Sequence, residues 1–337
     1  MPGVDAMRGV AALTVALFHW EHIAFGTPNA EQVFRYGLLG VEFFFMISGF
    51  VIMMVAGRTS GAGEFWMARA VRLYPAYWFS VLVTAVYVLM VGKYDLAAVL
   101  VNLTMLQSFL SVPNITNPYW TLAFEISFYL GMTLVVRLDG LRRVEAIALA
   151  WLVAGLVYRG VAPAALAFDP DRPLVQIAYI LVAPQFSPFF VAGMMLYRLR
   201  RGEIGRAGYA ALVLALAMTF AGRGDFAQVP GVIYGPLALL MAAALYLAAG
   251  LAAPGPAWRA LAWLGLVSYP LYLLHCSLAN LAALAAPMLA LPVSAAVLLS
   301  ALLSILLAWL VHQWIERPAQ RWGSRRLSQR RVLLAPV

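Results

Sequence analysis

Charged side chains are scarce in this chain. Only 11% of its 337 residues are Asp, Glu, Lys or Arg, whereas 64% are hydrophobic, and the mean hydropathy is +0.86. A soluble domain of this length needs more charge to cover its surface, so the composition excludes an ordinary soluble protein. It indicates a protein that lies largely inside a lipid bilayer.

Cysteine is rarer still, because Cys276 is the only one in the sequence. A single cysteine excludes a disulfide within the chain. Cys276 follows His275 on a predicted helix, where neighbouring side chains point about 100° apart, so we do not expect a nucleophile–base pair. We interpret Cys276 as a small packing residue. No group of His and Cys residues has the spacing typical of metal ligands, so we expect no metal site.

Long apolar runs are abundant. A bilayer core needs about 20 apolar residues per helical span, and runs of this length favour helices over barrel strands. We therefore expect one all-α polytopic membrane domain over residues 1–337, with about ten transmembrane helices and a basic tail from about residue 317. The predicted spans are 6–24, 36–57, 73–91, 118–136, 144–162, 174–197, 206–221, 231–252, 265–289 and 293–314.

Two segments need a separate interpretation. The first span carries a basic flank like a signal peptide but no evident cleavage site, so we expect it to be retained. Residues 92–117 are apolar in their middle but interrupted by polar residues, and we expect them to stay on one side of the membrane as a re-entrant or interfacial helix. If they crossed it, the later loops would lose the charge asymmetry described next.

Basic residues outnumber acidic ones by 23 to 14, which gives a net charge of +9. With both termini in the cytoplasm, 18 of the 23 basic residues fall on the cytoplasmic side. This asymmetry follows the positive-inside rule and predicts that orientation. Basic loops that face an anionic leaflet also explain the net charge, so we expect the lipid bilayer, and no nucleic acid, as the partner of these residues.

Arg8 and His19 interrupt the first predicted span. They lie eleven residues apart, so on a helix their side chains share one face and are separated by about 16 Å along the axis. An ionisable side chain in a membrane helix is costly and usually faces a cavity or a partner. This face would suit a ligand with anionic groups at the membrane surface and a reactive end deeper inside.

Four further ionisable residues lie at the edge of, or inside, apolar runs. Arg69 and Arg72 are three residues apart, so on a helix they share a face and can clamp phosphate oxygens, although topology alone also explains cytoplasmic arginines. Glu125 lies about two turns below the outer surface and needs a cationic partner or a proton. His275 lies near the middle of its span, where an interhelical hydrogen bond explains it better than catalysis.

The second and fourth spans carry other polar positions. Glu42, near the outer end of the second span, is expected to reach water. Ser48 and Gly49 allow a neighbouring helix to approach closely. Trp120 is most simply a residue of the interfacial aromatic belt, and His312, near the end of the last span, receives no role.

Several stretches occur in the order typical of one family, and they cover residues 5–318. The sequence resembles the membrane-bound acyltransferase family 3, polytopic bacterial acyltransferases that decorate sugars and related compounds. Glu42 and Thr121 stand where Asp and Ser are common in the family, which preserves the charge and the hydroxyl. Some members carry an additional extracytoplasmic domain, which we do not expect here. The matching stretches are Asp5-Ala6-Met7-Arg8-Gly9 with Phe18-His19, Gly40-Val41-Glu42-Phe43-Phe44 with Ile47-Ser48-Gly49-Phe50, Arg69-Ala70-Val71-Arg72-Leu73-Tyr74-Pro75, Trp120-Thr121-Leu122-Ala123-Phe124-Glu125, Ser268-Tyr269-Pro270-Leu271-Tyr272-Leu273-Leu274-His275 and Glu316-Arg317-Pro318.

The resemblance implies an integral membrane O-acyltransferase, in the first place an O-acetyltransferase, of the bacterial cytoplasmic (inner) membrane. It implies acyl-CoA (acetyl-CoA) as donor substrate, arriving from the cytoplasm, and no tightly bound cofactor. The acceptor would be a carbohydrate or glycosylated compound of the cell envelope or for export. Arg8, Arg69 and Arg72 would hold the anionic nucleotide end of the donor.

The resemblance also implies roles for the remaining candidates. His19 would act as general base on the acceptor hydroxyl, with a covalent acyl-histidine as the minor alternative. Glu125 would orient His19 or bind the acceptor, and the sequence leaves both roles open. The residues expected to line the acceptor site or the cavity are Glu42, Ser48, Trp120 and His275.

Two other functional classes stay open at this stage. In a transporter, Arg8, His19 and Glu125 would line a substrate or proton path, although the paired halves typical of transporters are not visible here. A scaffold subunit of an envelope-assembly complex is the weaker alternative, and it would tolerate loss of His19. The acceptor, the length of the acyl chain, the side from which the acceptor enters and the oligomeric state are also open.

Overall fold

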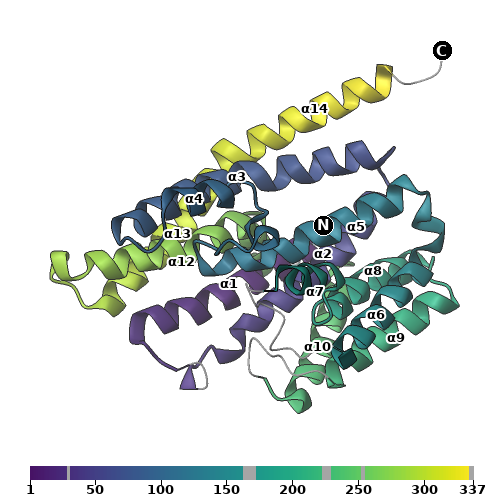
Figure 1. Ribbon diagram of the computed structural model, residues 1–337, viewed down its shortest axis with the longest axis horizontal. Coiled ribbons are helices and arrows are strands. Elements are labelled where there is room, and N and C mark those ends of the chain that lie inside the picture. The colour runs from purple at the N-terminus through teal and green to yellow at the C-terminus, as the bar shows by residue number, and fades with distance from the viewer. Residues whose placement is uncertain (29–30, 162–171, 222–228, 252–254, 334–337) are drawn as a thin grey trace.

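The computed structural model describes residues 1–28, 31–161, 172–221, 229–251 and 255–333. The regular elements within these ranges are helices, which confirms the all-α prediction (Figure 1). Apolar runs adopt this structure because a helix satisfies its own backbone hydrogen bonds where no water is present.

Within the described ranges, seven helical segments are long and apolar enough to cross a membrane. They confirm a helical membrane protein, while their number is lower than the ten predicted. The segments are α2 (Gly40–Ala56) with η2 (Arg35–Leu39), α3 (Ala62–Met90), α5 (Trp120–Arg137) with η4 (Asn117–Tyr119), α6 (Val144–Val161) with η5 (Gly140–Arg143), α7 (Pro173–Val182) with α8 (Ser187–Arg201), α10 (Gly231–Ala248), and α13 (Val293–Val311) with η8 (His312–Glu316) and the first part of α14 (Arg317–Leu333).

Three other predicted spans fold as helices without passing this test alone. α1 (Pro2–Phe25) covers the first predicted span, and its polar residues, Arg8 and His19 among them, lower its hydropathy. α9 (Arg206–Ala221) has the predicted bounds, but its 16 residues are short for a bilayer core. The ninth predicted span, 265–289, corresponds to α12 (Ser268–Ala285), which meets the preceding helix α11 (Pro256–Leu266) at 72°, and the two could together form an eighth span.

The third predicted span begins earlier than expected. Helix α3 starts at Ala62, and Pro75 lies inside the helix. A proline inside a helix removes one backbone hydrogen bond and usually kinks the helix, but α3 continues across Pro75. Arg69 and Arg72 therefore belong to the same helix as the membrane-spanning residues that follow them.

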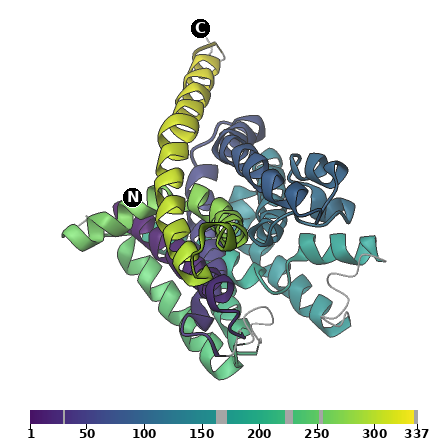
Figure 2. The same ribbon diagram turned by 90° about the vertical axis from the view of Figure 1, so that its left-hand side faces the viewer.

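The basic tail is also helical, which the sequence analysis did not predict. The chain continues from α13 through the π-helical turn η8 into α14, which ends at Leu333. Arginine, glutamine and leucine, which make up most of α14, are good helix formers, and the helix continues across Pro318 and Gly323. Figures 1 and 2 show α14 extending away from the other helices, with the C-terminus at its far end.

The connection at residues 92–117 has the limited structure expected of it. It contains α4 (Leu96–Asn102) and η3 (Gln107–Leu110). The seven residues of α4 extend only about 10 Å, so this helix is too short to cross a membrane. A second short turn, η7 (Pro287–Leu289), follows α12.

Helix α1 packs against α2, α11, α12 and α13, of which α2 and α12 also contribute to the site described below. Its closest contacts are made at glycines. A Cβ atom on Gly9 would lie 2.3 Å from the carbonyl oxygen of Leu261, and one on Gly265 would lie 1.7 Å from that of Asp5. Only glycine lets the backbones of α1 and α11 approach this closely.

Helices α2 and α8 cross in the same manner. A Cβ atom on Gly49 would lie 2.0 Å from the carbonyl oxygen of Phe190, and one on Gly193 would lie 1.9 Å from that of Met46. The expectation that Gly49 allows a close helix approach is confirmed. This crossing fixes the position of Ser48, the residue before Gly49, which faces the cavity described next.

Candidate active site

A cavity of about 100 Å³ lies between α1, α2, α3, α5 and α12, and we name it the arginine cavity. On α2 its lining extends from Val41 to Ile52, a length of about 16 Å along the helix. Its other lining residues include Arg8 from α1, Arg69 and Arg72 from α3, and residues of α5 and α12. Arg8 and the pair Arg69 and Arg72, which is distant from it in sequence, therefore face one space.

The arginines differ in how they are paired. Within the described residues, Arg8 and Arg69 have no hydrogen-bond or ion-pair partner, and Nε of Arg69 is buried without one. Arg72 instead donates from Nη1 to Oε1 of Glu316 at 3.0 Å. A guanidinium group that is partly buried is costly without hydrogen-bond partners, so those of Arg8 and Arg69 are available for an anionic ligand.

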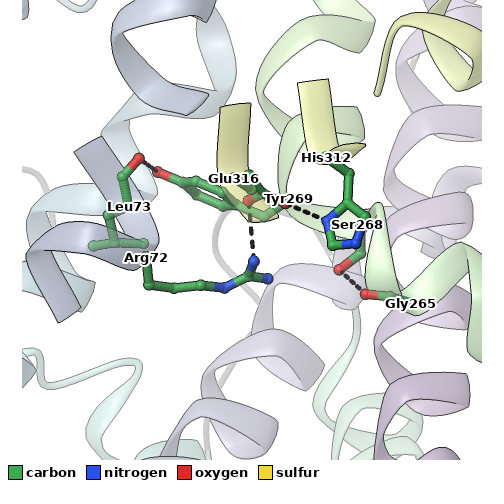
Figure 3. Close-up of polar contacts among 7 residues, drawn as sticks. All are labelled: Arg72, Leu73, Gly265, Ser268, Tyr269, His312 and Glu316. Atoms are coloured by element: carbon green, nitrogen blue, oxygen red, sulfur yellow. Dashed lines mark hydrogen bonds and ion pairs between the residues drawn. The ribbon is translucent and has the colours of Figure 1, made fainter. Parts of the chain in front are cut away.

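Glu316 links Arg72 to the turn that joins α13 and α14 (Figure 3). Its side chain is buried, and its second oxygen bonds Nδ1 of His312 at 2.7 Å. The guanidinium of Arg72 also lies over the ring of Tyr269, at 5.8 Å from the centroid. No role was predicted for His312, and the structure makes it a partner of the carboxylate that holds Arg72.

Glu125 is the one carboxylate in the described lining of the arginine cavity. Its Oε1 accepts hydrogen bonds from the hydroxyls of Ser48, at 3.4 Å, and Tyr129, one helical turn further along α5. The structure therefore places Glu125 with the arginines and Ser48. It gives no hydrogen bond between Glu125 and His19 within the described residues.

A second group of residues, which we name the histidine cluster, consists of His19, His275, Asn117 and Cys276. The side chains of His19 and His275 are buried, and their rings are in contact, with centroids 5.1 Å apart. Nδ1 of His19 lies 3.0 Å from the carbonyl oxygen of Val15 and 3.1 Å from Nε2 of His275. Nε2 of His19 lies 3.2 Å from the amide nitrogen of Asn117.

Cys276 corrects one expectation from the sequence. Its Sγ lies 3.3 Å from Nε2 of His275, so the two neighbouring side chains do make contact. The ligand atoms of His19, His275 and Cys276 lie within 4.8 Å of one another. Sequence spacing could not show this group, because His19 lies far from the other two in the chain. The absence of a metal stays a prediction.

The histidine cluster adjoins the arginine cavity at Thr121 and Tyr272, which line the cavity. Their hydroxyls are hydrogen-bonded to each other at 2.9 Å. The backbone carbonyl of Tyr272 lies 2.8 Å from Nδ1 of His275, and Thr121 follows Asn117 by one helical turn. His19 is therefore just beyond the cavity lining, although it is not part of that lining.

The four residues expected to line the acceptor site or the cavity are separated. Ser48 lines the arginine cavity, and His275 lies in the histidine cluster. Glu42 does not reach water as expected: it is 3% exposed and accepts a hydrogen bond from the hydroxyl of Tyr234 at 3.3 Å. Trp120 packs against Phe186, with ring centroids 5.7 Å apart.

Comparison with known proteins gives a consistent result. The chain matches the acyltransferase domain family over residues 1–313. It is 25% identical over 245 residues to the acyltransferase MdmB of Streptomyces mycarofaciens, covering 65% of this chain and 63% of MdmB. It is 30% identical over 324 residues to the exopolysaccharide production protein ExoZ of Rhizobium meliloti (strain 1021), covering 87% of this chain and 92% of ExoZ.

A third relative is YrhL of Bacillus subtilis (strain 168), named as a candidate peptidoglycan O-acetyltransferase. The identity is 26% over an alignment of 378 residues, which covers 98% of this chain and 56% of YrhL. The chain thus spans less than two thirds of the length of MdmB and of YrhL. No solved structure matches the chain.

Proposed function

The chain belongs to the acyltransferase domain family, and we propose that it transfers an acetyl group from acetyl-CoA to a hydroxyl of a carbohydrate or glycosylated acceptor of the cell envelope or for export. The observation that carries this proposal is the pair of unpartnered guanidinium groups, Arg8 and Arg69, that face a cavity next to a buried histidine.

The arginine cavity is suited to the donor. Coenzyme A carries phosphate groups at one end and a thiol at the end of a long, thin arm. Arg8 and Arg69 provide the cationic donors that phosphate oxygens need, while Arg72 contributes its charge with its orientation held by Glu316. The length of the cavity along α2, about 16 Å, accommodates part of the arm and directs the thioester toward Thr121 and Tyr272.

In the proposed reaction, Nε2 of His19 removes the proton from the acceptor hydroxyl while the hydroxyl oxygen attacks the thioester carbonyl. The carbon–sulfur bond then breaks, the new ester stays on the acceptor, and the coenzyme A thiolate takes up a proton. Since the ring of His19 is buried, water has little access to it, which limits hydrolysis of the thioester.

Glu125 receives a different role. Because its partners are Ser48 and Tyr129 within the arginine cavity, we assign it to the organisation of that cavity and not to the orientation of His19. A single carboxylate among three arginines lowers the mutual repulsion of the cations before the donor binds.

For the membrane arrangement, we propose about ten spans with both termini in the cytoplasm of a bacterial cell and the protein in its inner membrane. The distribution of basic residues supports this orientation, and helices at each of the ten predicted positions support the number. The arginine cavity then receives acetyl-CoA from the cytoplasm. The names of ExoZ and YrhL support an extracellular polysaccharide or peptidoglycan as the class of acceptor.

The test is release of free thiol from acetyl-CoA by the purified, detergent-solubilised protein. We expect release by the wild-type protein, even with water as the only acceptor, and none above background with His19→Ala. Binding of coenzyme A, measured by calorimetry, should persist in His19→Ala. A folded wild-type protein that neither binds coenzyme A nor releases thiol would refute acetyl-CoA as the donor.

A further inference from the structure

The hydrogen bonds of the histidine cluster determine which ring nitrogen of His19 is basic. From them we propose that His275 is a positioning residue that holds His19 in the form needed for a general base, and that Asn117 occupies the place of the acceptor hydroxyl. This inference rests on the proposed acyl transfer and deepens it, because it identifies where the acceptor binds.

The first step concerns His275. Its Nδ1 lies 2.8 Å from the carbonyl oxygen of Tyr272 and 3.2 Å from that of Leu271. Carbonyl oxygens only accept hydrogen bonds, so Nδ1 of a neutral His275 carries the proton. Its Nε2 then has a free lone pair, which faces Nδ1 of His19.

The second step passes this constraint to His19. Nδ1 of His19 lies between two acceptors, the carbonyl oxygen of Val15 at 3.0 Å and Nε2 of His275 at 3.1 Å. Neither acceptor can donate a proton, so the hydrogen bonds require that Nδ1 of His19 carries the proton and donates it. Nε2 of a neutral His19 is therefore unprotonated, as a general base must be.

The third step concerns the partner of that lone pair. The side-chain nitrogen of Asn117 lies 3.2 Å from Nε2 of His19, and an amide N–H donates to it. An acceptor hydroxyl must make the same kind of bond, O–H to nitrogen, before it gives up its proton. The acceptor and Asn117 therefore compete for a single lone pair.

The position of Asn117 indicates the direction from which the acceptor enters. Asn117 lies in η4, at the start of the helical segment that continues into α5, and one turn before Thr121 at the arginine cavity. The donor thus reaches the reaction centre from the arginine cavity. The acceptor reaches it from the other direction, where Asn117 and the residues that precede it lie. The proposed ligand at this position is a hydroxyl-bearing compound such as a sugar. When it binds, its hydroxyl replaces the amide of Asn117 as the hydrogen-bond donor to Nε2 of His19.

His275 is tested with two substitutions that differ in one property. Glutamine places an amide oxygen near the position of Nε2, where it can accept from His19, and leucine fills the space without an acceptor. We expect His275→Leu to lower kcat for thiol release about ten- to a hundredfold, in the range known for partners that orient catalytic or metal-bound histidines. The KM for acetyl-CoA should stay unchanged, and His275→Gln should recover most of the kcat.

If the leucine variant does not fold, His275→Asn replaces it, because asparagine can still donate to the carbonyl of Leu271 but is too short to reach His19. Equal losses in the glutamine variant and in its leucine or asparagine counterpart, or no loss in either, would overturn the role of His275. Wild-type protein that releases no thiol from acetyl-CoA would instead refute the proposed function, and this inference with it.

Asn117 is tested with water as the acceptor. We expect Asn117→Ala to raise acetyl-CoA hydrolysis several-fold, because the lone pair of His19 becomes open to water. The matched control is Asn114→Ala, the same substitution a few residues earlier, where the side chain bonds Gln107 and Ser108 and not His19. Hydrolysis that falls in Asn117→Ala, or rises equally in both variants, would overturn the assignment of Asn117 to the acceptor's place.

Discussion

The arginine cavity and the histidine cluster lie side by side, but they are organised in opposite ways. The cavity holds three cations, and two of them have no partner among the described residues. In the cluster, both ring nitrogens of His19 and of His275 have partners. A charged side chain without a partner is typical of a ligand-binding site. An imidazole ring with hydrogen bonds at both nitrogens is instead held in one orientation.

Under the proposed function, this difference would separate donor binding from acyl transfer along a single helix. α1 contributes Arg8 to the cavity and His19 to the cluster, about three helical turns apart. If the comparison is correct, substitutions in the cavity change the affinity for the donor, and substitutions in the cluster change the rate of transfer. Each of the following predictions can contradict that separation.

The largest effect is expected for His19→Ala. Removal of a general base lowers kcat by about 10²- to 10⁴-fold, because the acceptor hydroxyl keeps its proton during attack. The affinity for coenzyme A should change less than about twofold, since His19 does not line the cavity. Calorimetry with coenzyme A and thiol release measured on the same preparation would check both quantities. A matching loss of affinity would show that the two regions are not separate.

The next largest effect, a loss of stability, is expected for a substitution where α2 and α8 cross. A methyl group on Gly49 would lie 2.0 Å from the carbonyl oxygen of Phe190, so Gly49→Ala forces the helices apart and costs about 1–3 kcal/mol. The shift moves Ser48 in the arginine cavity and leaves the histidine cluster in place. Thermal unfolding in detergent should show a lower Tm, together with weaker binding of coenzyme A.

Gly131→Ala is the matched control for this crossing. Gly131 lies inside α5 with open space around its Cα, so an added methyl group meets nothing within 4 Å. We expect no loss of stability, because alanine favours a helix more than glycine does. If the two variants unfold at the same temperature, the close crossing of α2 and α8 does not limit the stability of the fold.

Arg69 and Arg72 differ within the cavity itself. A hydrogen bond to a charged group contributes about 1.5–3 kcal/mol, so Arg69→Ala should weaken coenzyme A binding by about 10- to 100-fold without lowering stability. Arg72→Ala removes the partner of Glu316, a buried carboxylate, and should also lower the Tm. Titration with coenzyme A and thermal unfolding of both variants would check this. Equal Tm values would mean that the bond to Glu316 has little effect on stability.

Sequence predicts those parts of this site that depend on residues close together in the chain, and not those that depend on residues far apart in it. The shared face of Arg8 and His19 and that of Arg69 and Arg72 depend on helical spacing, which is local. The contact between His19 and His275 joins opposite ends of the chain, and that between Arg72 and Glu316 joins two helices far apart in sequence. No periodicity in the sequence shows which distant residues meet.

The residues that the sequence analysis missed have the same explanation. Asn117 lies in a turn-rich stretch, where asparagine is expected for the turn itself. Tyr129 and Tyr272 were indistinguishable from the many other aromatic residues of apolar helices. The fold class was easier to predict than the site, because the length of the apolar runs alone predicts helices. The number of spans was harder to predict, because α1 carries polar residues and the chain bends between α11 and α12.

The smallest effect is expected at the junction, for Tyr272→Phe. The substitution removes the hydroxyl that bonds Thr121 but keeps the ring and the backbone carbonyl that holds His275. The hydroxyl of Tyr272 also contacts the carbonyl oxygen of Pro118 at 3.3 Å. Because a phenol has a single proton to donate and Thr121 itself donates to that carbonyl, the loss corresponds to one hydrogen bond of about 0.5–1.5 kcal/mol, and kcat should fall less than about tenfold. A loss as large as that of His19→Ala would place the Tyr272 hydroxyl among the reacting groups, and the histidine cluster would then extend into the arginine cavity.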